Sequence, residues 1–355
     1  MQRRESNAAS QIQFAQPGNT GPSNGNAFVL DRRSPLVNAR GMALTSLRIS
    51  LTDRCNEQCL YCRPAGSRAK SPIAREGELT KEEILGIAES LVPVGVTTIR
   101  LTGGEPLIRP DLEEIVSGLS NLVPRPHLRL TTNGLGLARR ARSLASAGLD
   151  RVNVSLDSVS ARTYAAITGR DGLGSVIEGI EEARRCGLTP LRTNTVVCAG
   201  INDQELGDIC RKVWQLGATP RFIELMPMGP LGRDSSRLLS AGSILARIEE
   251  TVGPLSPLGP DAQGGPSLYF ETQEGQRLGI IASVTGHICE RCNRGRITAR
   301  GGLQTCLAGP VEADLRAAWH QGGQKAVLAE ATKAAAAKRP RIQWPKNAAM
   351  VDIGG

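Results

Sequence analysis

The stretch that decides the fold is Arg48-Ile-Ser-Leu-Thr-Asp-Arg-Cys-Asn-Glu-Gln-Cys-Leu-Tyr-Cys62, a short β-like run that opens into three cysteines. These cysteines, Cys55, Cys59 and Cys62, have the spacing C-x3-C-x2-C. A 4Fe–4S cluster is usually held by four thiolates, so three thiolates on one loop would leave one iron without a protein ligand. The spacing therefore indicates a cubane cluster with one iron open to another molecule.

Zinc is the alternative for this triplet. A structural zinc ion is usually closed by four Cys or His ligands, and no fourth Cys or His lies near the loop. The spacing favours an iron–sulfur cluster, and zinc stays open as a second interpretation.

An aromatic residue, Tyr61, stands directly before the last cysteine, and the motif thus resembles the signature of the radical S-adenosylmethionine (SAM) enzymes. In that family the open iron is chelated by the amino and carboxylate groups of SAM, and one electron from the cluster cleaves SAM. A second motif, Gly103-Gly104-Glu105-Pro106, follows the next expected strand. It resembles the family motif for the SAM amino group, in which backbone carbonyls and Glu105 would receive the ammonium.

The length and composition of the chain limit the kinds of protein that it can be. It has 355 residues, of which 40% are hydrophobic, enough for one large domain or two ordinary ones. We find no apolar run that could span a membrane and, after Arg3-Arg4, no apolar segment typical of a secretory signal. The net charge of +9 indicates either a solvated basic surface or an anionic partner, a nucleic acid or a polyphosphate.

Cysteine usage points to the cell interior. Six of the nine cysteines fall in two triplets, and the others are Cys186, Cys198 and Cys210. A disulfide framework is unusual in a chain of this length without a signal sequence. The triplets therefore predict metal binding in a reducing, cytoplasmic setting.

An alternation of strands and helices begins at Ser46. The expected strands cover 47–52, 96–102, 127–131, 151–156, 191–197 and 221–226, and the expected helices cover 80–92, 109–119, 137–147, 173–186 and 203–216. Such βα steps predict an α/β fold with a parallel sheet and helices outside. The resemblance implies an incomplete (βα)6 barrel, with the site at the carboxyl ends of the strands.

Three regions are expected along the chain. Residues 1–40 are rich in polar residues, Gly and Pro, so we expect a largely disordered tail whose last part, 36–42, could pack on the domain. Residues 41–228 would form the barrel. Residues 229–355 would form a C-terminal region, with a mixed connector up to 278 and an Ala-rich helix over 328–338.

The C-terminal region carries the second triplet, Cys289-x2-Cys292-x13-Cys306. His287 could complete a Cys3His zinc site, so the spacing alone leaves zinc and iron–sulfur open. The segment 287–298, followed by Cys306-Leu, resembles the C-terminal motif of the GTP 3′,8-cyclase family of molybdenum cofactor biosynthesis. In that family the second site is also a 4Fe–4S cluster with an open iron, which faces the guanine of the substrate.

This resemblance runs from about residue 47 to residue 306 and includes the terminal Gly354-Gly355. Further motifs match in order: Leu-Thr-Gly-Gly-Glu-Pro-Leu (101–107), Thr-Thr-Asn-Gly (131–134), Asn-Val-Ser-Leu-Asp (153–157), Asn194 with Gly-Ile-Asn (200–202), and Phe-Ile-Glu (222–224). The resemblance implies a lyase that converts GTP to (8S)-3′,8-cyclo-7,8-dihydroguanosine 5′-triphosphate. It also implies SAM and two 4Fe–4S clusters as cofactors, an electron donor, a homodimer, and a downstream cyclic pyranopterin monophosphate synthase.

Site residues follow from the resemblance, position by position. The SAM-binding positions fall on Tyr61, Gly104, Ser155 and Met226. The GTP-binding positions fall on Arg48, Arg100, Thr131, Arg192, Arg294, Gly295 and Arg296. Arg221 is a further candidate, because guanidinium groups bind phosphate through paired, charge-assisted hydrogen bonds. Catalytic roles fall on Arg294, Arg296, Gly354 and Gly355, the two glycines entering the active site at the end of the chain.

Three positions depart from the family pattern. Thr98 stands where many members have a Lys beside Arg100, which would remove one cation from the phosphate site. Arg192 stands where Lys is usual, and the segment 337–343 lacks an expected histidine.

Two other functions are consistent with parts of the sequence. A radical SAM enzyme that modifies a peptide would need the clusters but not the arginines. A zinc-containing nucleic-acid-binding protein would use the basic charge, although aromatic residues make up only 3% of the chain, so that stacking platforms for single strands would be scarce. We expect a protein that binds neither nucleic acid nor a membrane.

Overall fold

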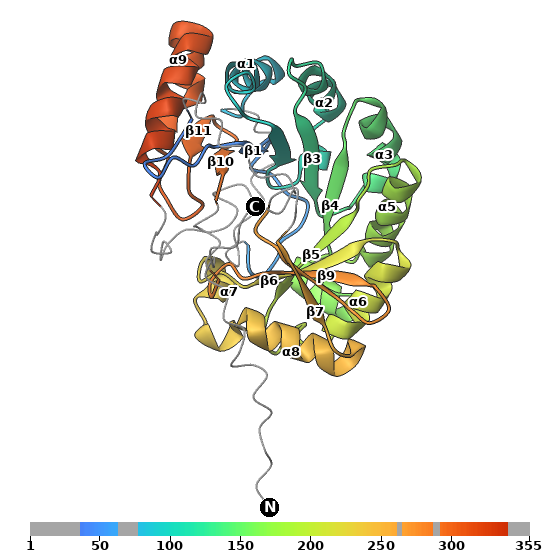
Figure 1. Ribbon diagram of the computed structural model, residues 1–355. Helices are drawn as coiled ribbons and strands as arrows, with labels where there is room; N and C mark the ends of the chain where they lie inside the picture. The colour runs from blue at the N-terminus through green and yellow to red at the C-terminus, as the bar shows by residue number, and fades with distance from the viewer. Residues whose placement is uncertain (1–35, 63–76, 261–264, 287–291, 340–355) are drawn as a thin grey trace, which may run out of the picture.

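The structure is a computed structural model that describes residues 36–62, 77–260, 265–286 and 292–339. Its centre is a curved sheet surrounded by helices (Figure 1). Six strands pair in chain order and in parallel. They are β1 (Ser46–Ser50), β2 (Thr98–Thr102), β3 (His127–Thr132), β4 (Arg151–Ser155), β5 (Arg192–Val197) and β6 (Thr219–Glu224). The predicted parallel α/β fold is therefore confirmed.

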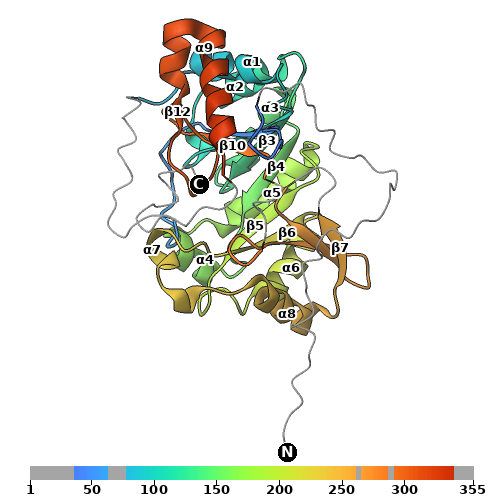
Figure 2. The same cartoon turned by 60° about the vertical axis from the view of Figure 1, so that its left-hand side comes forward.

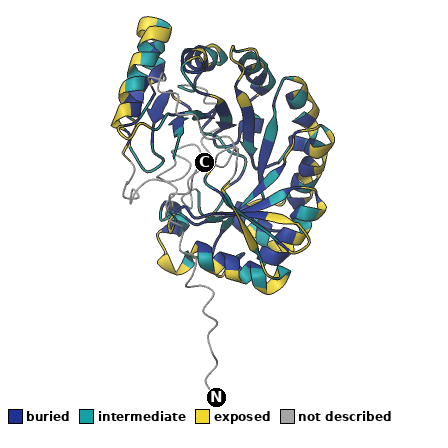
Figure 3. Cartoon of the chain, viewed as in Figure 1, coloured by how far each residue is buried: buried dark blue, intermediate teal, exposed yellow. Residues whose placement is uncertain are grey.

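The predicted helices cover the outside of this sheet (Figure 1). They are α1 (Lys81–Leu91), α2 (Leu112–Ser120), α3 (Leu137–Ser146), α5 (Leu173–Arg185) and α6 (Leu206–Gln215). Alternate strand residues such as Leu47, Ile99, Leu128 and Val152 are fully buried. Figure 3 shows the buried strands inside a ring of helices whose outer faces are exposed. Burial of these apolar side chains, at about 25 cal/mol per Å², holds the two layers together.

The start of α1 has the predicted capping box. The Thr80 hydroxyl accepts a hydrogen bond from the Glu83 amide (3.2 Å), and the Glu83 carboxylate accepts one from the Thr80 amide (2.8 Å). Two amides that the helix leaves unsatisfied are thereby paired. Glu83 also binds Arg316 and His320 of the C-terminal helix, so the same carboxylate joins α1 to that helix.

The C-terminal region extends the sheet at both ends. Strand β10 (Arg294–Ile297) pairs in parallel with β1, and β9 (Arg277–Ile281) pairs in parallel with β6. The described strands follow the order β12-β11-β10-β1-β2-β3-β4-β5-β6-β9-β8-β7, in which β11 is Gly302–Gln304 and β12 is Ala313–Asp314. Within the described residues the barrel is therefore open, with eight parallel strands at its centre.

The segment expected as a mixed connector up to 278 contains both helices and strands. This segment forms α7 (Gly229–Gly232), the 3-10 helix η2 (Ser235–Arg237), α8 (Ala241–Val252), β7 (Ser256–Pro260) and β8 (Leu268–Glu271). The sequence of β7, Ser-Pro-Leu-Gly-Pro, is typical of a turn. It forms a strand because it lies at the edge of the sheet, where a proline does not remove a ladder hydrogen bond.

Two helices differ from the sequence expectation. Helix α4 (Ala161–Thr168) was not predicted, and α9 (Leu315–Ala337) begins well before the expected residue 328. Gly322 and Gly323 have non-helical backbone angles inside α9, so the chain kinks there and continues. Helix α9 packs on α1 (Figure 2), where a Cβ atom on Gly86 would lie 2.4 Å from the Trp319 ring.

The described end of the N-terminal tail packs as expected. Leu36 is 1% exposed, and its carbonyl accepts a hydrogen bond from the Leu44 amide at 2.7 Å. The expected disorder of the tail concerns residues 1–35, which lie outside the described residues. Among the described helices, none has the length and apolar character needed to cross a membrane.

Candidate functional site

The three cysteines of the first motif follow β1 at its carboxyl end. Cys55, Cys59 and Cys62 are half-buried and in no disulfide among the described residues, and the Cys62 amide donates to the Cys59 carbonyl at 2.9 Å. Burial raises the pKa of Cys59 well above its ordinary value, as do the charges of Glu57, Asp157 and the other two thiols. The Cys59 thiol therefore lies within electrostatic reach of the other two.

Within the described residues, no three Cys, His, Asp or Glu side chains converge closely enough to hold one metal ion. Thiolates that bind separate irons of a cubane do not need to converge on one ion.

The unpredicted helix α4 holds the cysteine loop. The Gln58 amide donates to the Thr168 carbonyl at 2.9 Å, and the Tyr164 hydroxyl donates to Glu57 Oε1 at 2.6 Å. The Glu57 side chain is buried, and its Oε2 lies 3.6 Å from the Cys59 sulfur. Helix α4 thus positions the loop through both backbone and side-chain contacts.

The glycine motif packs directly against the start of the cysteine loop. The Gly104 amide donates to the Thr52 carbonyl at 2.7 Å. A Cβ atom on Gly104 would lie 2.0 Å from the Arg54 carbonyl oxygen, and one on Gly103, whose φ is +148°, would lie 2.6 Å from the Thr52 oxygen. Because backbone atoms cannot move aside as a flexible side chain can, both positions require glycine.

Glu105 has a structural task in this turn. It is 1% exposed, and its carboxylate accepts hydrogen bonds from the Leu107 amide (2.8 Å), the Thr132 hydroxyl (2.7 Å) and the Asn133 amide (2.7 Å). Burial raises its pKa to about 7. The Glu105 carboxylate therefore joins the glycine turn to the end of β3 and the residue after it.

The predicted SAM positions lie at the same end of the sheet. The Tyr61 hydroxyl donates to Asp157 Oδ2 at 2.6 Å, just beyond β4, where Ser155 is the last residue. Met226 follows β6, and its carbonyl oxygen would lie 2.0 Å from a Cβ atom on Gly232. Tyr61, Gly104, Ser155 and Met226 thus follow β1, β2, β4 and β6 at their carboxyl ends.

Arginines form a row across the inner face of the sheet. In the register of the strands, Arg296 lies beside Arg48, Arg48 beside Arg100, Arg100 beside Arg129, and Arg129 beside Arg151. Paired residues on neighbouring strands point to the same face, and the alternate apolar residues face the helices. The row therefore faces the barrel interior. Arg129 and Arg151 were missed by sequence reasoning.

The arginines act on one another electrostatically. Burial lowers the pKa of Arg48 well below its ordinary value, and the charges of Arg296, Arg294 and Arg100 lower it further. Burial and then Arg294 lower the pKa of Arg296 to about 10. Since buried like charges destabilise each other, this interior favours the binding of an anion with several charges.

Polar side chains connect the arginines of different strands. Arg100 Nη1 donates to the Thr131 hydroxyl at 3.2 Å, and Arg221 Nη2 donates to Asn194 Oδ1 at 2.6 Å. With its amide oxygen turned toward the two arginines, Asn153 accepts from Arg221 at 2.8 Å and from Arg100 at 2.5 Å. These asparagines fix the guanidinium groups and were not predicted as site residues.

The guanidinium group of Arg192 lies over the Tyr269 ring, 5.6 Å from its centre. Tyr269 belongs to β8, so a strand of the C-terminal region orients a predicted substrate-binding residue of β5. A guanidinium group stacks on an aromatic face better than the ammonium group of a lysine, and this contact explains how the structure accommodates Arg at position 192.

The described part of the second cysteine motif flanks β10 and β11. Cys292 precedes β10, and Cys306 follows β11, whereas Cys289 and His287 lie outside the described residues. Arg294 Nε lies 3.4 Å from the Cys292 sulfur. Although burial alone raises the pKa of Cys292, the charges of Arg294 and Lys338 lower it to about 7. This environment favours the thiolate that a metal would bind.

Lys338, near the end of α9, was missed by sequence reasoning. Its buried Nζ donates to the Cys292 carbonyl at 2.6 Å and to the Arg294 carbonyl at 2.7 Å, and it lies 3.5 Å from the Cys292 sulfur. It therefore joins the long C-terminal helix to the loop that carries the second motif. A lone lysine after an Ala-rich helix gives no signal of this contact in the sequence.

Of the glycines predicted to contact the substrate or assist catalysis, Gly295 lies among the described residues. A Cβ atom on Gly295 would lie 2.7 Å from the Leu44 side chain, so this position faces away from the arginines and is explained by packing. Only the Gly295 backbone is available for its predicted substrate contact. Gly354 and Gly355 lie outside the described residues.

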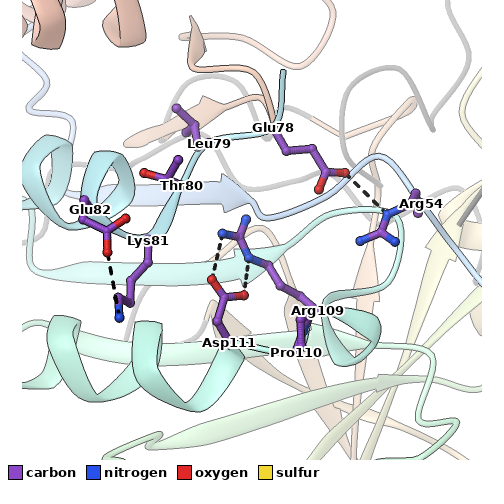
Figure 4. A pocket seen from close by; sticks show the side chains of 9 residues that line it. All are labelled: Arg54, Glu78, Leu79, Thr80, Lys81, Glu82, Arg109, Pro110 and Asp111. Atoms are coloured by element: carbon purple, nitrogen blue, oxygen red, sulfur yellow. Dashed lines mark hydrogen bonds and ion pairs between the residues drawn. The ribbon is translucent and has the colours of Figure 1, made fainter. Parts of the chain in front are cut away.

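A separate cavity of about 260 Å³ lies near the start of α1 (Figure 4). Its charged lining residues are paired with one another as Arg54–Glu78, Lys81–Glu82 and Arg109–Asp111. The cavity thus lacks the concentration of cations found inside the barrel, and we do not assign it to the substrate.

Two family models match consecutive parts of this chain. Residues 49–213 match the model of the Radical SAM superfamily, and residues 218–344 match that of Molybdenum Cofactor Synthesis C. The GTP 3′,8-cyclase of Pelotomaculum thermopropionicum is 40% identical over 317 residues, covering 87% of this chain and 97% of the relative. The chain belongs to the GTP 3′,8-cyclase family. The GTP 3′,8-cyclase of Streptomyces coelicolor is 41% identical over 80% of this chain and 83% of its own length.

Solved structures show the shared fold alone. Streptococcus suis SuiB bound to S-adenosylmethionine is 15% identical, with a TM-score of 0.58 over 79% of this chain and 66% of that chain. SuiB bound to the precursor peptide SuiA is 14% identical, with a TM-score of 0.59 over 88% of this chain and 74% of that chain. As a member of the radical SAM superfamily, this chain uses SAM and an iron–sulfur cluster.

Proposed function

We propose that this chain converts GTP to (8S)-3′,8-cyclo-7,8-dihydroguanosine 5′-triphosphate, the first step of molybdenum cofactor biosynthesis. The observation that carries the proposal is the row of inward-facing arginines on β10, β1, β2 and β3. A triphosphate supplies the several negative charges that such a row requires. The name shared by the relatives supports the same substrate.

Cys55, Cys59 and Cys62 would hold the first 4Fe–4S cluster, because their thiols lie together at the carboxyl end of β1. When bound, the cluster and SAM would supply the radical chemistry that joins ribose C3′ to guanine C8. Gly104 would orient SAM through its backbone, and a side chain at this position would clash with the Arg54 carbonyl of the cysteine loop. Tyr61, Ser155 and Met226 would complete the SAM site.

The arginines would hold the triphosphate and exclude water from the reacting ribose. Arg48, Arg100, Arg192 and Arg221 come from four strands, and neighbouring polar side chains such as Thr131 fix them before the substrate arrives. Preorganised charges of this kind lose little free energy on binding and act strongly in a low-dielectric interior.

Cys289, Cys292 and Cys306 would hold a second 4Fe–4S cluster that binds the purine. The low pKa of Cys292 supports a metal ligand at this position. Arg294 and Arg296 lie on β10, between this motif and Arg48, and would act on the substrate there. Gly354 and Gly355 would enter the site, since glycine occupies little space.

We further propose a homodimer in the cytoplasm, supplied by a separate electron donor and followed by cyclic pyranopterin monophosphate synthase. The division into a barrel over 41–228 and a C-terminal region over 229–355 also stays a proposal. Strands of both regions share one sheet, so we expect the two regions to unfold together.

Arg100→Gln is expected to weaken GTP binding by about 10- to 100-fold, because a charge-assisted hydrogen bond to phosphate is lost. Iron content and SAM binding should stay unchanged. Arg211→Gln on α6, whose side chain is 51% exposed and pairs with Asp208, serves as the control. The measurement is anaerobic titration calorimetry with GTP on the reconstituted protein. The proposed function would be contradicted if Arg100→Gln bound GTP with wild-type affinity. It would also be contradicted if SAM cleavage depended on a peptide and not on GTP.

Lys338→Met is expected to lower the iron content from about eight toward about four per chain, because the second cysteine loop loses the cation that holds it. SAM cleavage at the first site should persist. Lys333→Met on the same helix removes an exposed lysine and should keep all the iron. The readout is iron, sulfide and zinc analysis after anaerobic reconstitution. Full iron content in Lys338→Met would contradict this role, and zinc in the wild type would contradict the second cluster.

A further inference from the structure

Arg129 is a buried cation of the barrel interior to which the sequence motifs assign no role. It is 9% exposed and belongs to β3. Its register partners are Arg100 on β2 and Arg151 on β4, so it stands inside the arginine row. On the same strand, Leu128 and Leu130 are fully buried toward the helices, which places Arg129 on the opposite, inner face.

The surroundings of Arg129 are those of the proposed phosphate site. Burial and then the charges of Arg221, Arg129, Arg192 and Arg294 lower the pKa of Arg100 well below its ordinary value. Arg129 is therefore close enough to Arg100 to act on its charge. A bound anion shared by Arg100 and Arg129 would offset the repulsion between their two charges.

The neighbouring strand supplies a reason for a cation at this point. Strand β2 presents Thr98 and Arg100 to the interior, and Thr98 is in register with His127, two residues before Arg129. Adjacent strands lie about 4.8 Å apart, which is less than the reach of an arginine side chain. The Arg129 guanidinium can thus reach the space that a longer, charged side chain at position 98 would occupy.

We propose that Arg129 binds the triphosphate of the substrate and supplies from β3 the cation that β2 lacks at Thr98. This inference rests on the proposed function, because it names a further residue of the same phosphate site. Arg129 contacts the phosphates and not the guanosine, since it lies in the row with Arg100, on a different strand from the second cysteine motif.

The test is anaerobic titration calorimetry with GTP, GMP and guanosine on the reconstituted protein. Arg129→Gln is expected to weaken the binding of GTP by about 10- to 100-fold, because a charge-assisted hydrogen bond is lost. The affinity for guanosine should stay unchanged. Arg129→Lys keeps the charge and should lose less GTP affinity than Arg129→Gln. Arg139→Gln, an exposed arginine on α3, is the matched control and should bind all three ligands as the wild type does.

The outcomes separate the inference from the proposed function. Failure of the wild type to bind GTP overturns both. GTP binding by the wild type with equal affinity in Arg129→Gln overturns the role of Arg129 alone, and so does an equal loss for GTP and guanosine, which indicates a structural role. Thr98→Lys in the Arg129→Gln background should regain part of the lost GTP affinity. No regain would overturn the claim that the two positions serve the same phosphate.

Discussion

Cys59→Ala is expected to abolish SAM cleavage. The Cys59 thiol lies within electrostatic reach of the other two thiols of the first loop, and its sulfur is 3.6 Å from the buried Glu57 carboxylate that α4 holds in place. With two thiolates the loop cannot retain the irons, so about four irons per chain should be lost. The measurements are iron content after anaerobic reconstitution and the formation of 5′-deoxyadenosine from SAM with a reductant.

Cys198→Ala is the matched control for that experiment. Cys198 is 1% exposed, follows β5 and belongs to neither triplet, so its replacement should leave both the iron content and SAM cleavage intact. Circular dichroism would establish that both variants are folded. Retention of SAM cleavage in folded Cys59→Ala would remove the basis for assigning the first triplet to the cluster.

Gly104→Ala is expected to destabilise the protein and to disrupt the SAM site. The added Cβ would lie 2.0 Å from the Arg54 carbonyl oxygen and 2.5 Å from its carbon, and these backbone atoms lead directly into Cys55. The turn and the cysteine loop must therefore separate, at a cost of about 1–3 kcal/mol or more for such overpacking. We expect a lower Tm and at least about tenfold weaker SAM binding, measured by thermal unfolding and titration.

Gly174→Ala is the control for the second experiment. Gly174 lies in α5, and a Cβ atom there would meet nothing within 4 Å. Alanine favours a helix by up to about 1 kcal/mol over glycine, so this variant should be as stable as the wild type or more so. If Gly104→Ala unfolded at the wild-type temperature and bound SAM normally, the close packing of the two motifs would not be required.

Much of the fold was predictable because its signals are local. The alternation of apolar runs placed the six central strands to within about two residues, and Thr80 with Glu83 marked the start of α1. Local patterns failed where position in the sheet decided the outcome. Strand β7 forms from a Pro- and Gly-containing segment because it lies at an edge, and α9 continues past Gly322 and Gly323 because it packs on α1.

The sequence by itself determined the cysteine loop, the glycine turn and the family, because each is a set of residues at fixed spacing along the chain. Only the tertiary structure decided which distant residues meet. An arginine in a strand is ordinarily a solvated charge, and only the strand register places Arg48, Arg100 and Arg129 in one inward-facing row. Likewise, only the course of α9 brings Lys338 to Cys292. Contacts between distant segments depend on strand order and helix packing, which no short stretch of sequence encodes.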